Sequence, residues 1–379
     1  MSPCALPTAH TSARWTNLTF HRTTRATPTT GNHMPHITDA STFLALRDTG
    51  LPVLDARSPS EHARGAIPGA LNLPVLDDAQ REAVGTLYAR SGREAAVHLA
   101  LQLVGPHLSA MLARAQHLCE NRHEVLVHCW RGGMRSGSLA WLLESAGYTV
   151  HLLEGGYKAY RAHVRAQLAR PARVIVLGGM TGTGKTDILH AMADLGCQVV
   201  DLEGLANHRG SAFGSIGLGK QPTNEQFEAA LYEVWSRLDH GRPIWMEDES
   251  SRIGTVAMCD AFFTHIEHGR LVTVELPLEA RVARLVAEYA ATGETEAMLH
   301  GLERIRKRLG DDAWRRCADA LRAGDHTTAV RILLRYYDKA YAHHQAQQPR
   351  EAVRHIVLER DDPATVARRL AADEDSLAG

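Results

Sequence analysis

Cys129 is the residue whose surroundings most clearly predict chemistry. It follows an apolar run at 125–128 and precedes the string WRGGMRS, after which an apolar helical pattern begins. A cysteine on a loop that enters a helix faces the positive end of the helix dipole and several backbone N–H groups, which favour its thiolate and can hold an oxyanion. Arg135 completes the spacing C-x5-R, and its guanidinium can clamp such an anion with two hydrogen bonds. We predict Cys129 and Arg135 as catalytic residues; a buried strand-end cysteine without a function is the alternative.

A second string, GMTGTGKT at 179–186, has the form G-x-x-x-x-G-K-T and lies between a predicted strand and a predicted helix. In such a loop the glycines expose backbone N–H groups to phosphates, the lysine adds a positive charge, and the hydroxyl of the last residue can hold Mg²⁺. The predicted phosphate-binding residues of this loop are Gly179, Gly182, Gly184, Lys185 and Thr186.

A carboxylate that shares the Mg²⁺ is expected at the end of the run PIWMEDE, residues 243–249. Asp248 stands where a Walker-B-type carboxylate would coordinate the metal. Glu247 and Glu249 remain alternatives, because alternation along the strand does not show which side chain points inward. We predict Asp248 as a further phosphate-site residue and, with Thr186, as a ligand of Mg²⁺; solvated acids at a strand end are the alternative.

Two further stretches are rich in groups that bind anions. Residues 208–228 are rich in glycine and polar residues, and residues 303–335 hold nine Arg and Lys residues. Aromatic residues near the second stretch, Trp314 among them, add surfaces on which bases can stack. A plain surface loop and a solvated helical face are the alternatives. The predicted RNA-binding residues are Arg209, Lys220, Arg304, Arg306, Arg308, Arg315 and Arg316.

The chain that must position these residues has 379 residues, enough for two domains of roughly 100–200 residues each. Its 42 Lys and Arg against 43 Asp and Glu give a net charge of −1, so any RNA must be held by local patches. No apolar run approaches the ~20 residues of a membrane span, which predicts a protein without a membrane partner. The six scattered cysteines contain no C-x-x-C pair, which indicates neither a disulfide framework nor a zinc site, and favours the reducing cytoplasm.

Short apolar runs alternate with helical periods along most of the chain, and this pattern predicts an α/β fold. Strands are expected at 51–55, 125–128, 149–153, 173–179, 197–203, 243–249, 270–277 and 353–359. We divide the chain into a disordered or over-extended N-terminal segment (1–36), a first α/β domain (37–165), a linker (166–172), a P-loop NTPase-like parallel-sheet domain with added RNA-binding helices (173–370) and a flexible tail (371–379).

The first domain resembles the rhodanese superfamily. Besides the cysteine loop, it carries LDARSPSEHARGAIPGALNLP at 54–74 and EGGYKAYR at 154–161, which match the pattern of that superfamily. The resemblance implies that Cys129 carries sulfur or selenium as a persulfide-type intermediate, whereas Asp55 and Arg57 serve the structure. The loop is one residue longer than the usual sulfurtransferase loop and has the length found in cell-cycle phosphatases and arsenate reductases, which leaves room for a tetrahedral anion.

From residue 34 to about residue 370 the chain resembles the tRNA 2-selenouridine synthases. The matching strings are HCWRGGMRSGS, LEGGYKAYR, GGMTGTGKT, DLEGLANHRGSAFG, EDESSRIG and LLRYYDKAY. The resemblance implies that wobble 2-thiouridine of a tRNA, at position 34, is S-geranylated with geranyl diphosphate and then receives selenium from selenophosphate through Cys129. It also implies tRNA and a selenophosphate-producing enzyme as partners. The oligomeric state is not predicted.

Two other functions are consistent with the same motifs. One is a phosphatase or arsenate-reductase-like cysteine domain fused to an NTP-dependent kinase. The other is a passive rhodanese-like module joined to a regulatory NTPase, which the intact Cys129 disfavours. The phosphate loop itself can bind either a nucleotide or only the diphosphate of geranyl diphosphate, and both alternatives stay open at the level of sequence.

Overall fold

The computed structural model describes residues 34–378 except 121, 212, 291–292 and 348–349. Of the predicted N-terminal segment 1–36, residues 1–33 lie outside the described residues. Its last residue, His36, already belongs to the first strand, so the folded domain begins one residue earlier than predicted.

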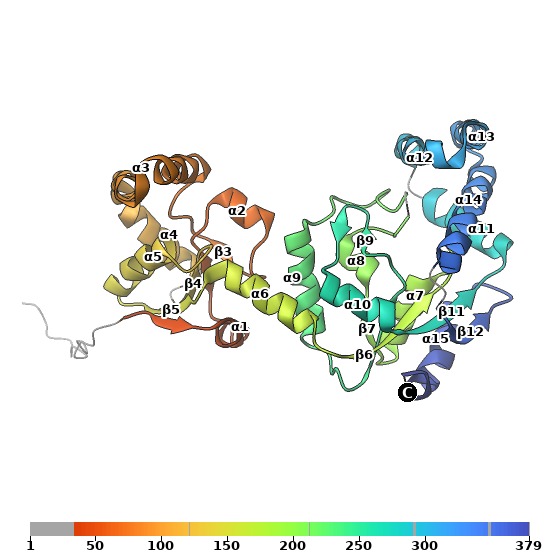
Figure 1. Ribbon diagram of the computed structural model, residues 1–379, viewed down its shortest axis with the longest axis horizontal. Coiled ribbons are helices and arrows are strands. Elements are labelled where there is room, and N and C mark those ends of the chain that lie inside the picture. The colour runs from red at the N-terminus through yellow and green to blue at the C-terminus, as the bar shows by residue number, and fades with distance from the viewer. Residues whose placement is uncertain (1–33, 121, 212, 291–292, 348–349, 379) are drawn as a thin grey trace, which may run out of the picture. The chain divides into compact units, whose positions relative to one another are not determined.

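The first domain is built on a parallel five-stranded sheet with the order β1-β5-β4-β2-β3 (Figure 1). The strands are β1 (His36–Thr38), β2 (Val53–Asp55), β3 (Leu71–Asn72), β4 (Glu124–His128) and β5 (Thr149–Leu153). Side chains of β4 alternate between two cores: Val125 and Val127 pack with Leu139 of a helix on one face, and Leu126 packs with Phe43 of a helix on the other. A parallel sheet covered on both faces explains why this strand reads as a continuous apolar run.

The helices of this domain are α1 (Ala40–Asp48), α2 (Pro59–Arg64), α3 (Asp78–Val104), the 3-10 turn η1 (Gly105–His107), α4 (Leu108–Leu118), α5 (Met134–Ser145) and α6 (Gly156–Leu168). α6 continues through the first three residues of the predicted linker, so that only 169–172 separate it from the next strand. The helix continues because Val164 and Leu168 are buried on its apolar face.

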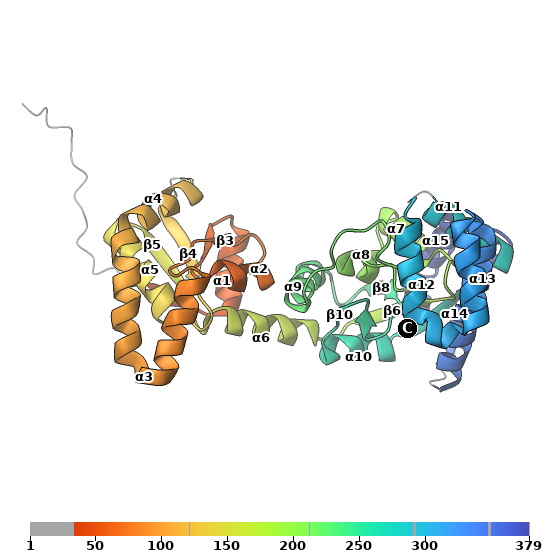
Figure 2. The same ribbon diagram turned by 90° about the horizontal axis from the view of Figure 1, so that it is seen from above.

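α3 differs from the other helices because only Ala96 among its residues is buried. Gly92, with φ of 82°, breaks its helical geometry, and Figure 2 shows the two arms on either side of the bend. The stretch Asp78–Leu118 is long and apolar enough, by length and composition alone, to cross a membrane, with a mean hydropathy of 1.3 in its most apolar window. The bend at Gly92 and the turn at Gly105–His107 divide it into shorter helices. That the protein has no membrane partner stays a prediction.

The second domain has its own parallel sheet, with the order β12-β11-β6-β8-β7. The strands are β6 (Arg173–Gly178), β7 (Gln198–Val200), β8 (Pro243–Glu247), β11 (Arg270–Glu275) and β12 (Ala352–Val357), with a small hairpin of β9 (Arg252–Ile253) and β10 (Val256–Ala257) beside them. Ile175 and Leu177 of β6 pack with Ile188 and Leu189 on one face of the sheet. The predicted α/β fold, with a parallel sheet in the second domain, is therefore confirmed, and the sheet of the first domain is parallel as well.

The helices around this sheet are α7 (Lys185–Asp194), α8 (Leu202–Ala206), α9 (Asn224–Trp235), α10 (Asp260–His268), α15 (Pro363–Ala372) and α16 (Glu374–Ala378). Four more helices are added to it: α11 (Leu278–Ala290), α12 (Thr295–Leu309), α13 (Asp311–Arg322) and α14 (His326–Gln347). Both views show α12, α13 and α14 side by side (Figures 1 and 2). Their shared core contains Met298, Leu302, Cys317, Leu321 and Ala329.

The prediction of a flexible tail at 371–379 is wrong for the part that the structure describes. Residues 374–378 form α16, Leu377 is 3% exposed, and Glu374 accepts a hydrogen bond of 2.9 Å from the indole N–H of Trp245. An acidic, alanine-rich string gives no local sign of this, because the tail is ordered by contacts with a distant strand.

Candidate active site

Cys129 lies between β4 and α5, on a loop that curls back on itself through Gly132, which has φ of 66°. The cysteine is 3% exposed, and its Sγ lies 3.1 Å from the Oγ of Ser136 in the first turn of α5. Since the strand delivers the thiol to the N-terminus of the helix, the loop has the geometry that the sequence predicted.

The electrostatic surroundings of Cys129 favour its thiolate. Burial by itself would raise the pKa of this thiol, but hydrogen bonds from the Ser136 hydroxyl and from backbone N–H groups of Ser136, Arg131 and Gly133 outweigh burial and lower the pKa below its ordinary value. Every other cysteine among the described residues has a pKa raised by burial, to about 11 for Cys197 as one example. Cys129 is thus the described cysteine best suited to act as a nucleophile near neutral pH.

Residues 154–158, the start of the EGGYKAYR string, form backbone hydrogen bonds with the cysteine loop. The backbone N–H of Tyr157 donates to the carbonyl of Cys129 at 2.8 Å, and that of Lys158 donates to the carbonyl of Trp130 at 3.0 Å. Gly156, with φ of 60°, lies so close that a Cβ there would overlap the carbonyl of Cys129. The EGGYKAYR string is therefore part of the site, because only glycine fits at this contact.

Arg135 is oriented by a carboxylate. It forms an ion pair with Glu61 of α2. Burial alone would raise the pKa of the Glu61 carboxyl, but the contact with Arg135 outweighs burial, so the pKa is lowered. Arg81 of α3 lies 3.7 Å from the same carboxylate. Glu61 was not predicted as a site residue, although it belongs to the rhodanese-like string at 54–74. Asp55 and Arg57 form a fully buried ion pair, in keeping with a structural role.

The phosphate loop joins β6 to α7, as predicted, and Gly182 and Gly184 have φ of 82° and 78°. The ammonium of Lys185 donates to the carbonyl of Gly179 at 3.0 Å. A Cβ at Gly179 would approach the carbonyl of Val274 to 2.6 Å, so the loop requires glycine here. The loop borders a cleft of about 780 Å³, large enough for a small molecule.

Two arginines of α11 lie against the phosphate loop. Arg281 is buried, donates to the carbonyl of Thr181 at 3.2 Å and forms a two-bond pair with Asp338 of α14 at 2.8 Å for each bond. Arg284 lines the cleft and pairs with Asp361 at 2.7 Å. Neither arginine belongs to any motif in the sequence, so only the tertiary fold reveals them as site residues.

The carboxylates that line the cleft include the predicted Asp248 and its alternative Glu249. Asp248 lines the cleft but accepts a hydrogen bond of 2.7 Å from Arg350. Glu203, at the start of α8, accepts one of 3.1 Å from the hydroxyl of Thr186. Burial raises the pKa values of Glu203 and its neighbour Glu249. Glu247 faces away, toward the backbone N–H of Leu202. Glu203 was missed because α8 approaches the loop only in the folded protein.

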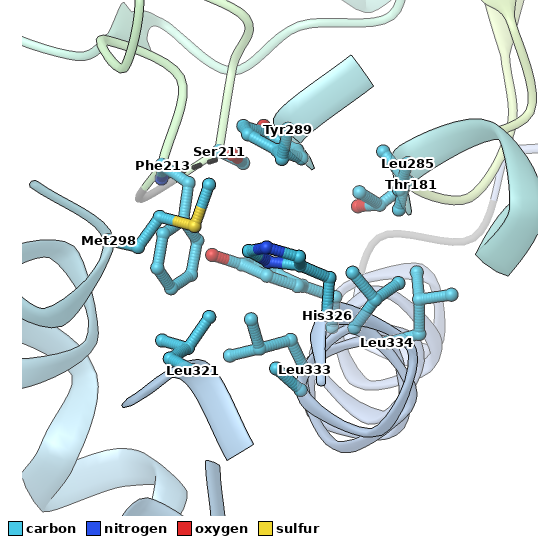
Figure 3. Close-up of a pocket in the computed structure, with 13 residues that line it drawn as sticks. Thr181, Ser211, Phe213, Leu285, Tyr289, Met298, Leu321, His326, Leu333 and Leu334 are labelled. Atoms are coloured by element: carbon cyan, nitrogen blue, oxygen red, sulfur yellow. Dashed lines mark hydrogen bonds between the residues drawn. The ribbon is translucent and has the colours of Figure 1, made fainter. Parts of the chain in front are cut away.

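An apolar pocket adjoins the phosphate loop (Figure 3). The loop contributes Thr181, and helices α11 to α14 contribute Leu285, Met298, Leu333 and other apolar side chains, which converge on the centre of the pocket in Figure 3. Several residues line both this pocket and the phosphate-loop cleft: Thr181, Ser211, Leu285, Tyr289 and Tyr337. The pocket is narrow, with a volume of about 40 Å³. A larger ligand would need side chains of the lining to move, and Met298 is the most flexible type among them.

A basic cavity of about 890 Å³ shares Gly210, Ser211 and Tyr337 with the phosphate-loop cleft. Lys220, Arg304 and Arg308 line it, as does Tyr336, whose ring packs edge to face against that of Tyr337. Arg252, which the sequence did not single out, also lines this cavity. Positive charge beside aromatic rings is the combination that binds single-stranded RNA.

The remaining predicted RNA-binding residues lie elsewhere. Arg209 lines the phosphate-loop cleft and pairs with Glu288 at 2.6 Å. Arg306 stacks on Trp314 at 4.3 Å and pairs with Asp311, and Arg316 lies 3.9 Å from Asp312. Neither Arg306, Arg315 nor Arg316 lines the basic cavity. The pair of Arg316 with Asp312 has the i,i+4 spacing of a helical ion pair, whereas the pair of Arg306 with Asp311 joins two helices and could not be predicted from spacing.

Both halves of the chain match known families. Residues 39–163 match the rhodanese-like domain, and residues 172–374 match the tRNA 2-selenouridine synthase AAA domain. With the two loops described above, these matches define a class of protein in which a rhodanese-like domain is followed by a P-loop domain.

Relatives over most of the chain make the assignment more specific. A tRNA 2-selenouridine synthase of Chromohalobacter salexigens is 36% identical over 334 residues, which are 80% of this chain and 90% of the relative. One of Hydrogenovibrio crunogenus is 37% identical over 324 residues, covering 77% of this chain and 88% of the relative. The chain belongs to the tRNA 2-selenouridine synthase family. Among solved structures, the N-terminal domain of a putative ATP/GTP binding protein from Clostridium difficile is 34% identical and covers 34% of this chain and 98% of its own, with a TM-score of 0.32.

Proposed function

We propose that this protein replaces the sulfur of wobble 2-thiouridine, at position 34 of a tRNA, with selenium in two steps, using geranyl diphosphate and selenophosphate as co-substrates. Membership of the family supports tRNA as the substrate. Two different reactive loops support two chemically different steps.

In the first step the thiocarbonyl sulfur attacks the first carbon of the geranyl group, the carbon–oxygen bond breaks, pyrophosphate leaves and a proton is lost from the base. The N–H groups of the phosphate loop, Lys185 and Arg284 surround the cleft in which the departing diphosphate would lie. Fixed positive charge at the place where negative charge develops lowers the barrier to its departure.

Mg²⁺ would find oxygen ligands beside the same diphosphate. The Thr186 hydroxyl and the Glu203 carboxylate are in contact, and two adjacent carboxylates with raised pKa values mark a place that a cation would stabilise. Among the described residues no group of three or more acidic, His or Cys side chains could hold a metal, so substrate oxygens would have to complete the coordination. Asp248, the predicted ligand, would first have to release Arg350.

In the second step selenium from selenophosphate replaces the alkylated sulfur. With one water, the products are 2-selenouridine, geranyl thiol and phosphate, and selenium keeps its oxidation state throughout. An S-alkyl group leaves more readily than a thiocarbonyl sulfur, which explains the order of the steps. Arg135 and the N–H groups of the cysteine loop would bind the selenophosphate anion next to the Cys129 thiolate.

The observation that carries the proposal is the apolar pocket that shares a wall with the phosphate-loop cleft, although this pocket would have to widen to take a geranyl chain. A nucleotide would place a polar ribose next to its phosphates, whereas a geranyl diphosphate places an apolar chain there. We place the reaction in the cytoplasm, with a selenophosphate-producing enzyme as the supplier of selenium.

The test is mass spectrometry of nucleosides from 2-thiouridine-containing tRNA incubated with the protein and each donor in turn. We expect S-geranyl-2-thiouridine with geranyl diphosphate alone and 2-selenouridine with both donors. Cys129→Ser should abolish the second product only, and Lys185→Ala should reduce the first. If the folded protein forms neither product, the proposal fails, and hydrolysis of phosphate esters would favour the phosphatase alternative.

A further inference from the structure

The cysteine loop, like the phosphate loop, borders an apolar groove. The groove has a volume of about 430 Å³, within the range of roughly 300–1,000 Å³ typical of small-molecule sites. One wall is the first arm of α3, the opposite wall is its second arm, and the start of α5 closes the end with Met134 and Arg135.

Its lining repeats at helical spacing on both arms. Val84 and Tyr88 lie on the first arm, and Val97 and Leu101 lie on the second. Side chains at such spacing normally pack face to face and are removed from solvent. Here they do not, because Tyr88 is 59% exposed, Leu101 is 65% exposed and Met134 is 55% exposed. An open apolar surface therefore lies at the end of the cysteine loop, next to Arg135.

The charged side chains that line this groove are arginines, and Glu61 behind them pairs with Arg135 and lies 3.7 Å from Arg81. Arg81, Arg93 and Arg135 line it together with the apolar side chains. A ligand with an apolar part and negative charge fits such a lining. An alkyl chain attached to a nucleotide of an RNA has both parts, since phosphates flank the modified base.

From this geometry we propose that the groove binds the geranyl chain of the S-geranylated tRNA while selenium displaces the sulfur at the cysteine loop. The inference rests on the proposed function. It accounts for the occurrence of an apolar cavity at each of the two reactive loops: one receives the chain as a diphosphate ester, and the other receives it as a thioether. Holding the chain would fix the thioether carbon next to the loop and retain the thiol that leaves.

The test isolates the second step. A tRNA that already carries S-geranyl-2-thiouridine is given free selenophosphate, and 2-selenouridine formation is measured with Tyr88→Ser, Leu101→Ser and the double variant. Trp141→Ser is the matched control, because Trp141 is 62% exposed on α5 but does not line the groove. A tRNA with an S-methyl group at the same position is the second substrate.

We expect the double variant to raise KM for the geranylated tRNA on the order of tenfold or more, as when apolar groups are removed from a specificity pocket. KM for the S-methyl tRNA and the rate of geranylation should stay as in wild type, and Trp141→Ser should change none of them. Unchanged KM in folded variants would overturn the inference, as would equal losses with both tRNAs, which would indicate general RNA contact. A defect that occurs only when an enzyme supplies the selenophosphate would assign the groove to a protein partner and also overturn it. If wild type does not convert the geranylated tRNA, the proposed function itself fails.

Discussion

Replacing Ser136 with alanine tests the electrostatic activation of Cys129. The variant removes the hydroxyl 3.1 Å from the sulfur and leaves the backbone N–H groups of the loop in place. A hydrogen bond to a charged group contributes about 1.5–3 kcal/mol, and 1.4 kcal/mol is about tenfold, so the thiolate fraction near neutral pH should fall roughly 10- to 100-fold. A less stabilised thiolate is also more nucleophilic, with a Brønsted coefficient of about 0.4–0.5, so the observed rate should fall only roughly 3- to 10-fold.

The assay is the pH dependence of the reaction of Cys129 with a small thiosulfonate, followed by peptide mass spectrometry so that other cysteines do not contribute. Because the folded protein lowers the pKa of this thiol, the wild-type rate should level off at a lower pH than the rate of Ser136→Ala. At high pH, where both are ionised, the variant should react faster. Ser145→Ala is the control, since its hydroxyl bonds a carbonyl of the same helix far from the sulfur. Coincident profiles for wild type and Ser136→Ala, or an equal shift in the control, would refute the reasoning.

Two further outcomes follow from contacts in the structure. Gly156→Ala should lower the free energy of unfolding in urea by about 1 kcal/mol or more, because its backbone is left-handed and a Cβ would meet the cysteine loop; Gly137→Ala, with nothing within 4 Å of the new Cβ, should not lower it. Arg304→Glu with Arg308→Glu should weaken tRNA binding and reduce the slope of log K against log salt by about 1 for each phosphate that is no longer neutralised. Arg316→Glu should do neither, and an equal effect of Arg316→Glu would mean that the basic cavity is not the RNA site.

The two reactive loops could be predicted from sequence because their chemistry is local. Gly182 and Gly184 need positive φ within a few residues of Lys185, and Cys129 needs a strand before it and a helix after it. A few neighbouring residues meet these requirements, so the sequence motif predicts the geometry of each loop. The order of the strands in each sheet was not predicted, because alternating runs do not show which strands are neighbours.

The walls of the cavities could not be predicted in this way. Leu285, Met298 and Leu333 come from separate helices that meet only in the folded chain. On α12, Arg304 and Arg308 are four residues apart and line the basic cavity, whereas Arg306, two residues from each, lies on another face of the helix and stacks on Trp314. The pocket walls depend on contacts between helices distant in the sequence, whereas the separation of Arg306 from Arg304 and Arg308 follows from the helical period once α12 is recognised.

The side chains of Ser211 and Tyr337 have a consequence for the order in which ligands bind. Both line the phosphate-loop cleft, the apolar pocket and the basic cavity. A ligand that moved either side chain in one cavity would change the shape of the other two and so couple their binding equilibria. Such coupling is reciprocal: whatever factor a bound prenyl donor contributes to tRNA affinity, bound tRNA contributes the same factor to donor affinity. If the proposed function holds, the shared wall predicts that the prenyl donor and tRNA influence each other's binding.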